Sequence, residues 1–157
     1  MLFQYQCRTE ITDMLSPLMI AITSDMSDGV EMLLDIGQDP YFVNSKGQTA
    51  LSYACMASDE KTVRLLCSKM DTVEIPTQKI DSFSSIAKYA VHSKNIEILR
   101  MILEKGCDLN RYDYSNEVPA DSIRGTIPDD LGVQFIDLMV KNGFDINVRS
   151  EKTMTSF

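Results

Sequence analysis

The chain repeats a two-part segment at a spacing of about 33 residues, and this periodicity limits its fold more than any other feature. The segment SPLMIAI begins at Ser16, and TALSYAC begins 33 residues later, at Thr49. Further copies begin with SIAKYAV at Ser85 and VPADSIR at Val118. A unit this short cannot bury an apolar face alone, so its copies must stack on one another. The sequence therefore predicts a solenoid of four stacked units.

The second half of each copy predicts an amphipathic helix with one stripe facing solvent. One position is polar in all copies, where it holds Glu31, Arg64, Arg100 and Asp137. The apolar positions around it hold Val30, Val63, Leu99 and Ile136; Met32, Leu65, Met101 and Leu138; Leu33, Leu66, Ile102 and Met139; and Leu34, Cys67, Leu103 and Val140. This helical spacing predicts that the apolar columns, including the methionines Met32, Met101 and Met139, are core.

The first halves predict shorter helices, and glycines mark the ends of the second ones. Ala21, Ala54 and Ala90 share a column where a neighbouring helix must come close. Gly37, Gly106 and Gly143 each follow a second helix, where the left-handed conformation that ends many helices favours glycine. Each begins a Gly-x-Asp group, which predicts a turn leading into an extended finger.

These features resemble the ankyrin repeat over roughly residues 14 to 149, most clearly in DPYFVNSKGQTALSYAC. The resemblance implies an all-α, ankyrin-type helical solenoid of stacked antiparallel helix pairs with β-hairpin-like fingers. It implies one domain over 1–157, with repeats at about 14–43, 44–79, 80–112 and 113–149, and irregular or truncated ends at 1–13 and 150–157. A tetratricopeptide array is the rival architecture, but the repeated Gly-x-Asp and polar finger speak against it. The odd ends favour a fragment of a longer array over a short protein with degenerate caps.

The copies depart from the family pattern at two places. The family's histidine near the start of the first helix is replaced by Met19, Ser52, Lys88 and Asp121. We expect the Thr–His hydrogen bond of the family to be missing and the fingers to be looser. In the fourth copy Ala120 and Ile123 invert the usual order of large and small residues, so its first helix is the least regular element expected.

Charge and cysteine usage exclude several classes of function. The 15 Lys and Arg against 23 Asp and Glu give a net charge of -8, which argues against nucleic-acid binding and favours a basic or mixed-charge protein partner. The four cysteines form no CxxC pair, so we expect no metal site and reduced, mostly buried thiols in a cytoplasmic or nuclear protein. No apolar run is long enough for a membrane span. We expect a monomer or part of a longer array.

Catalytic signatures are absent from the sequence. His92 is the single histidine, and its position in VHSKN predicts an exposed loop residue. Nucleotide-binding glycine motifs, the GxSxG nucleophile motif and the HExxH zinc motif do not occur. We therefore expect no enzymatic activity and no cofactor.

A binding surface is predicted where finger tips and first helices form the concave face of a repeat stack. Aromatic residues and Arg there are typical of binding hot spots, although packing on a neighbouring finger would also explain them. The partner-binding residues predicted from the columns are Tyr41, Phe42, Val43, Ser45 and Lys46 in the first finger; Arg111, Tyr112, Tyr114, Ser115 and Glu117 in the third; and Met56, Ala57, His92 and Ser93 on the short helices.

Three functions remain open from the sequence. The first is a protein–protein interaction module, as a scaffold or adaptor within a longer protein. The second is a stand-alone stoichiometric inhibitor of a partner enzyme, an idea that depends on fold and length alone. The third is a non-binding spacer within a larger enzyme or channel.

Overall fold

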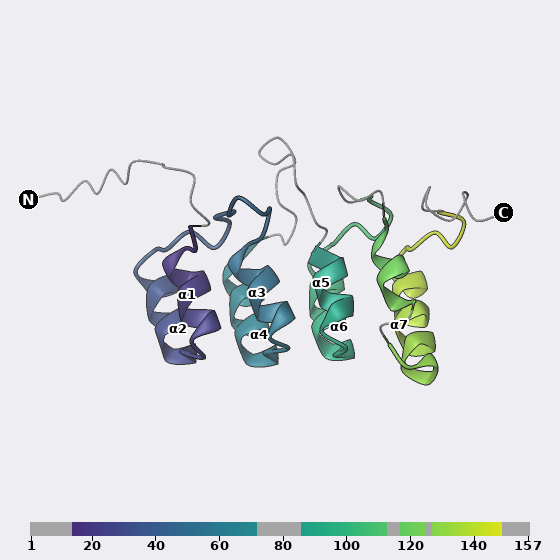
Figure 1. Ribbon diagram of the computed structural model, residues 1–157, viewed down its shortest axis with the longest axis horizontal. Coiled ribbons are helices and arrows are strands. Elements are labelled where there is room, and N and C mark those ends of the chain that lie inside the picture. Colours follow the sequence, from purple (N-terminus) through teal and green to yellow (C-terminus); the bar gives the residue numbers. More distant parts are fainter. Residues whose placement is uncertain (1–13, 72–85, 113–116, 125–126, 149–157) are drawn as a thin grey trace, which may run out of the picture.

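Helix pairs stand side by side in a row along the long axis of the molecule (Figure 1). The structure, a computed structural model, describes residues 14–71, 86–112, 117–124 and 127–148. Its elements are α1 (Pro17–Thr23), α2 (Ser27–Asp35), α3 (Ala50–Met56), α4 (Glu60–Lys69), α5 (Ile86–His92), α6 (Ile96–Glu104), the 3-10 helix η2 (Pro119–Ile123) and α7 (Asp129–Lys141). The all-α, ankyrin-type solenoid is confirmed. The described residues contain no strand, so the hairpin-like form of the fingers is not confirmed, and the repeat boundaries stay a prediction.

The short first helix of each copy is here called the inner helix, and in the first two copies it begins at a side chain that accepts hydrogen bonds from free backbone N–H groups. The Oγ of Ser16 accepts a hydrogen bond from the Met19 N–H at 3.2 Å. Thr49 and Ser52 cap reciprocally, because each hydroxyl accepts the other's N–H, at 3.3 and 3.2 Å. The bond expected to be lost with the family's histidine is therefore replaced at Ser52.

Two kinds of turn connect the helices, and both use the left-handed conformation. The second helix of each copy, α2, α4, α6 or α7, is here called the outer helix. Gly37, Gly106 and Gly143 have positive φ values after the outer helices α2, α6 and α7, as predicted. The turns from inner to outer helix also reach positive φ, at non-glycine residues: Asp25 (55°), Ser58 (54°) and Lys94 (57°). These side chains make the conformation sterically costly, and the sequence pattern did not reveal it.

Burial differs between copies in a way that shows which flank of each outer helix faces which neighbour. Val30, Val63 and Leu99 are fully buried, but Ile136, at the same position in the last copy, is 43% exposed. This flank of the helix therefore faces the following copy. Such a pattern is expected when each unit hides its apolar side only against a neighbour.

The opposite flank faces the preceding copy. Met101 is buried, whereas Met32, at the same position in the first copy, is 65% exposed because the described residues include no helix before it there. The prediction that Met32 is core is therefore wrong, and that for Met101 and Met139 is confirmed. Whether a residue is buried therefore depends on the position of its copy in the stack. A column of similar residues does not show that position.

Polar contacts also join neighbouring copies. The Lys69 ammonium lies 2.9 Å from the carboxylate of Asp35 in the copy before it. The Lys105 ammonium donates to the Met70 carbonyl at 3.0 Å, again in the preceding copy. These contacts are partly or fully exposed, so they fix the register of the stack more than they stabilise it.

Replacing Lys94 with glycine is expected to raise the free energy of unfolding by about 0.5–1 kcal/mol, because glycine adopts a positive φ without a steric cost. Urea denaturation measures this change. Ser58→Gly is the matched control, with a smaller gain expected, because it also removes a hydroxyl that donates to the Ser93 carbonyl at 2.8 Å. Destabilisation by Lys94→Gly would contradict the left-handed turn.

Candidate functional site

Asn44 organises the first finger, which comprises residues 38–49. Its Oδ1 accepts hydrogen bonds from the N–H groups of Lys46, at 3.0 Å, and Gln48, at 2.9 Å. Its Nδ2 lies 3.3 Å from the hydroxyl of Tyr53 on α3, which ties the finger to the inner helix. The side chain is buried, and sequence reasoning missed this role although Asn is a frequent turn residue.

The two aromatic residues of the first finger have different surroundings. Tyr41 is half-buried, packs against the core and accepts a hydrogen bond from the Asp71 N–H at 2.9 Å. Phe42 leaves 38% of its surface exposed. Val43 is half-buried, and Ser45 and Lys46 are exposed. Phe42 is therefore the aromatic side chain of this finger that is open to a partner, while Tyr41 joins two copies.

The inner helices add exposed side chains at their carboxyl ends. Met56 ends α3 with 51% of its surface exposed. His92 is exposed as expected, but it is the last residue of α5 and not a loop residue, so that part of the prediction is wrong. Helices α3 and α5 are neighbours, and the Nε2 of Gln48 in the first finger lies 3.8 Å from the Met56 sulfur. The placement of Ser93 on this surface is wrong. Ser93 is buried, because its hydroxyl turns back to the Ala90 carbonyl at 2.6 Å.

One apolar row on the inner helices was missed in the sequence. Ile20 on α1 is exposed, and the corresponding residues Tyr53 and Tyr89 on α3 and α5 are half-buried. Their recurrence at the repeat spacing is the signal that could have revealed them. We call the surface formed by the inner helices and the finger residues 38–49 and 106–112 the inner face.

The third finger contributes Arg111 and Tyr112. Arg111 is half-buried, and Tyr112 is 42% exposed. Tyr114 and Ser115 lie outside the described residues. Glu117 forms an ion pair of 2.9 Å with Lys88 of α5 across the copy boundary. Tyr112 therefore joins Phe42 and Met56 as a large side chain partly open on the inner face.

Titratable groups on and beneath this surface include His92 and three buried cysteines. Partial burial, and then the charges of Lys88 and Lys94, lower the pKa of His92 from its ordinary value. Cys55, Cys67 and Cys107 are buried thiols that form no disulfide, and desolvation raises the pKa of Cys55 and Cys67. Within the described ranges no group of three His, Cys, Asp or Glu side chains could hold a metal ion.

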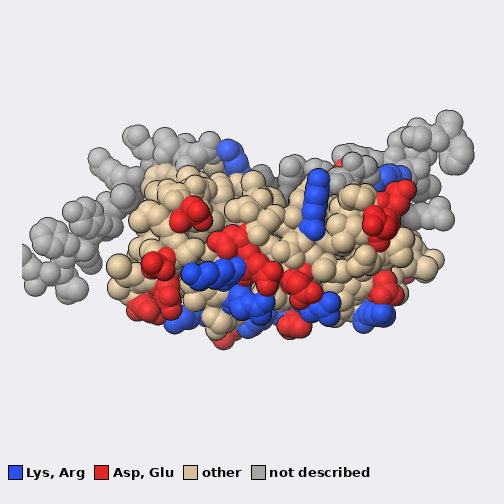
Figure 2. Space-filling view, turned by 90° about the horizontal axis from the view of Figure 1, so that it is seen from below, with Lys and Arg blue, Asp and Glu red and all other residues tan. Residues whose placement is uncertain are grey.

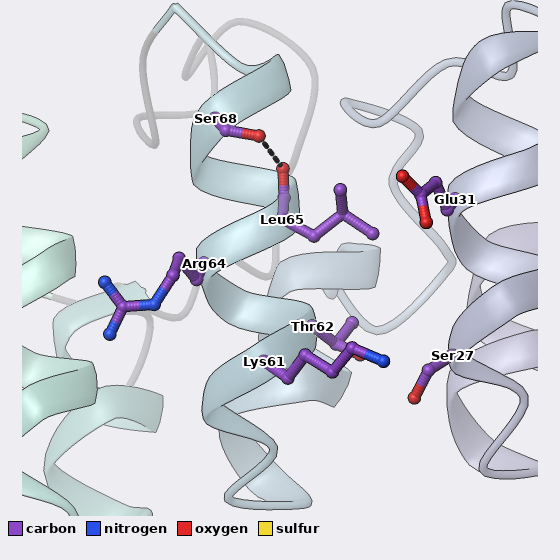
Figure 3. A pocket seen from close by; sticks show the side chains of 7 residues that line it. All are labelled: Ser27, Glu31, Lys61, Thr62, Arg64, Leu65 and Ser68. Atoms are coloured by element: carbon purple, nitrogen blue, oxygen red, sulfur yellow. Dashed lines mark hydrogen bonds between the residues drawn. The ribbon is translucent and has the colours of Figure 1, made fainter.

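A shallow pocket of about 390 Å³ opens on the other side of the stack, between α2 and α4 (Figure 3). Leu65 of α4 points across it toward Glu31 of α2, while Arg64 turns away to pair with Glu60 at 2.8 Å. The other lining residues are Ser27, Lys61, Thr62 and Ser68. The hydrogen bond drawn in Figure 3 joins the Ser68 hydroxyl to the Leu65 carbonyl at 2.6 Å, so this hydroxyl is turned back to its own helix.

Charges are mixed over the face that contains the turns between inner and outer helices. Figure 2 shows Lys and Arg side chains interspersed with Asp and Glu on this face. Exposed ion pairs also form along single helices of the chain, such as Lys141 with Asp137 at 2.6 Å. Interspersed charges of both signs do not give the continuous basic track that a phosphate backbone requires. Among the helices of the described ranges, none is both long and apolar enough for a membrane crossing.

Comparison with known proteins gives matches to repeat proteins. A family model described as ankyrin repeats (3 copies) matches residues 7–113. The chain is 35% identical over 120 residues to a putative ankyrin repeat protein of fowlpox virus. It is 33% identical over 105 residues to the ankyrin repeat and KH domain-containing protein mask-1 of Caenorhabditis elegans. It is 24% identical over 103 residues to the human B-cell lymphoma 3 protein.

The matches cover most of this chain but little of the relatives. They include 74%, 64% and 64% of the chain, in the order given, but only 16%, 4% and 22% of the relatives' lengths. The similarity therefore concerns the repeats, and not the relatives as whole proteins.

Asn44→Ala is expected to lower the free energy of unfolding by about 1–3 kcal/mol, because it leaves the N–H groups of Lys46 and Gln48 without their acceptor. Asn44→Asp keeps an acceptor oxygen at that position and should lose less. Urea unfolding of both variants provides the measurement. If both variants lost the same free energy of unfolding, the Oδ1 hydrogen bonds would not be what holds the finger.

The lowered pKa of His92 makes stability depend on pH. Protonation favours the unfolded chain, where histidine keeps its ordinary pKa of about 6.5. The contribution of His92 is therefore complete above about pH 6.5 and is lost as the pH falls toward the lowered pKa of the folded state. Denaturant midpoints measured between about pH 7.5 and 5.5 should fall less steeply for His92→Gln than for the unmodified chain. Parallel slopes would contradict the shift.

Proposed function

Because the chain belongs to the ankyrin repeat family, whose repeats are protein–protein interaction modules, we propose that it binds another protein through its inner face. The observation that carries the proposal is the exposure of Phe42, Met56 and Tyr112, three large side chains contributed by two fingers and an inner helix. Large apolar and aromatic side chains supply most of the energy at protein interfaces. A scaffold or adaptor role within a larger assembly follows from such binding.

The inner face is preorganised for a partner. The Asn44 hydrogen bonds hold the first finger against α3, and the Asp71–Tyr41 bond joins it to the next copy. Ordering these segments before binding reduces the entropy that association must overcome. Ile20, Tyr53 and Tyr89 extend the apolar surface along the inner helices.

The partner that fits best is a protein of basic or mixed charge. The chain has a net charge of -8, and both signs are interspersed on the face seen in Figure 2. A long-range attraction to basic surfaces raises the rate of encounter and weakens with added salt. The apolar contacts would then determine how long the complex lasts.

A double substitution, Phe42→Ala with Met56→Ala, tests the inner face. The chain is used to capture partners from a native lysate, the captured protein is purified, and its Kd is measured with each variant. Loss of two central apolar contacts should weaken binding by about 10-fold or more, while the melting temperature stays close to that of the unmodified chain. Tyr112→Ala should weaken binding in the same direction.

Arg100→Ala is the matched control, because Arg100 lies on the exposed side of α6, where it pairs with Glu97 at 3.4 Å. This variant should bind with an unchanged Kd. If Arg100→Ala weakened binding and the inner-face variant did not, the partner would bind the outer helices instead. Failure to capture any partner would favour the spacer role.

A further inference from the structure

Helix α7, the last outer helix among the described residues, exposes a flank that is covered in every earlier copy. Val133, Ile136 and Val140 of α7 are all exposed. The corresponding residues of the first three copies are buried or half-buried: Ser27, Val30 and Leu34; Glu60, Val63 and Cys67; and Ile96, Leu99 and Leu103. Within the stack, this flank is the surface against which the following copy packs. In α7 the same surface is apolar and open to solvent.

The first outer helix exposes the opposite flank. Met32 of α2 and Ile36, the residue that directly follows α2, are 65% and 69% exposed. Met101, at the position of Met32, is buried. Lys69 and Lys105, at the position of Ile36, both reach the preceding copy through the contacts described above. This flank of α2 is therefore the other half of the interface that joins the copies.

A polar bridge also joins neighbouring copies. After α6, the Asn110 Nδ2 donates to the Gly143 carbonyl of the next copy at 2.9 Å, and its Oδ1 accepts from the Asp145 N–H at 2.8 Å. Asn147 is the counterpart of Asn110 one copy later, and its amide bonds Asp145 of its own turn at 2.9 Å. The counterparts of Gly143 and Asp145 in the first copy are Gly37 and Asp39.

We propose that this chain associates head to tail with a second copy of itself, the α7 flank of one chain packing on the α2 flank of the next. We choose a second copy of the chain as the partner because the two open flanks are the two complementary halves of the interface that joins neighbouring repeats inside the chain. Ile136 and Val140 would pack beside Met32 and Ile36, and Asn147 would reach Gly37 and Asp39. This goes beyond binding at the inner face and does not depend on it.

Such an interface is heterologous, and because the copies follow one another in a row (Figure 1), it leads to open chains of more than two copies rather than a closed ring. It is also mainly apolar. Ile36 replaces the lysine of the Lys69–Asp35 pair, and Lys141 stands where Asp35 would be, already paired with Asp137. Added salt screens charge attraction but not apolar burial, so self-association should persist where binding of a charged partner weakens.

Sedimentation velocity of the full chain over a range of concentrations tests the proposal. The average mass should rise from 17.7 kDa past that of a dimer without reaching a plateau, in low and high salt alike. Two variants each remove one flank: Met32→Lys with Ile36→Lys, and Ile136→Lys with Val140→Lys. Each variant alone should stay monomeric, and a mixture of the two should form a 1:1 dimer through the flanks that remain.

Three results would overturn the proposal. The unmodified chain would stay at 17.7 kDa at every concentration if the flanks do not associate. A dimer of the Met32→Lys/Ile36→Lys variant alone would show a symmetric contact between two α7 flanks. Self-association that is unchanged in both variants would locate the contact elsewhere on the chain. Phe42→Ala with Met56→Ala should leave self-association intact, which separates this outcome from failure of the inner face.

Discussion

The packing of one helix pair on the flank of the next is the interaction on which the rest of the structure depends. Each copy has too little apolar surface to form a core alone, and burial along the outer helices follows the presence of a neighbour. Leu99 is fully buried and Ile136 is not, although both occupy the same position of the repeat. The inner face exists because this packing sets the fingers and inner helices in a row.

Helix caps and left-handed turns set the geometry within each copy. Reciprocal capping at Thr49 and Ser52 fixes the start of α3, and the left-handed residues Ser58 and Lys94 turn the chain from inner to outer helix. The Ser58 hydroxyl also reaches the next turn, at the Ser93 carbonyl. The same residues therefore serve both the shape of one copy and its contact with the next.

The fold could be read from the repeat spacing, but burial within it could not. The columns predicted the outer helices and the glycine turns, because both follow from helical periodicity and backbone geometry. Met32 was placed wrongly in the core, because a column does not say which copy has a neighbour on that flank. In the fourth copy Ile136 was also expected in the core but is 43% exposed, because the described residues include no copy after it.

The candidate site was predictable only in part, for a related reason. Phe42 and Tyr112 on the fingers and Met56 on an inner helix are exposed, as expected. Tyr41 and Ser93 are instead held by hydrogen bonds to distant or neighbouring backbone groups. Such bonds depend on which segments meet in space, as with Asn44, whose side chain contacts α3. A single sequence gives the residue types of a surface but not these contacts.

A pair of matched truncations tests the stacking account most directly. Leu99→Ala and Ile136→Ala alter the same repeat position, once between two copies and once at the open flank. The account predicts a loss of about 2–5 kcal/mol in the free energy of unfolding for Leu99→Ala, and a loss of under about 1 kcal/mol for Ile136→Ala. Equal losses, or a larger loss at Ile136, would contradict the claim that neighbouring copies provide each other's core.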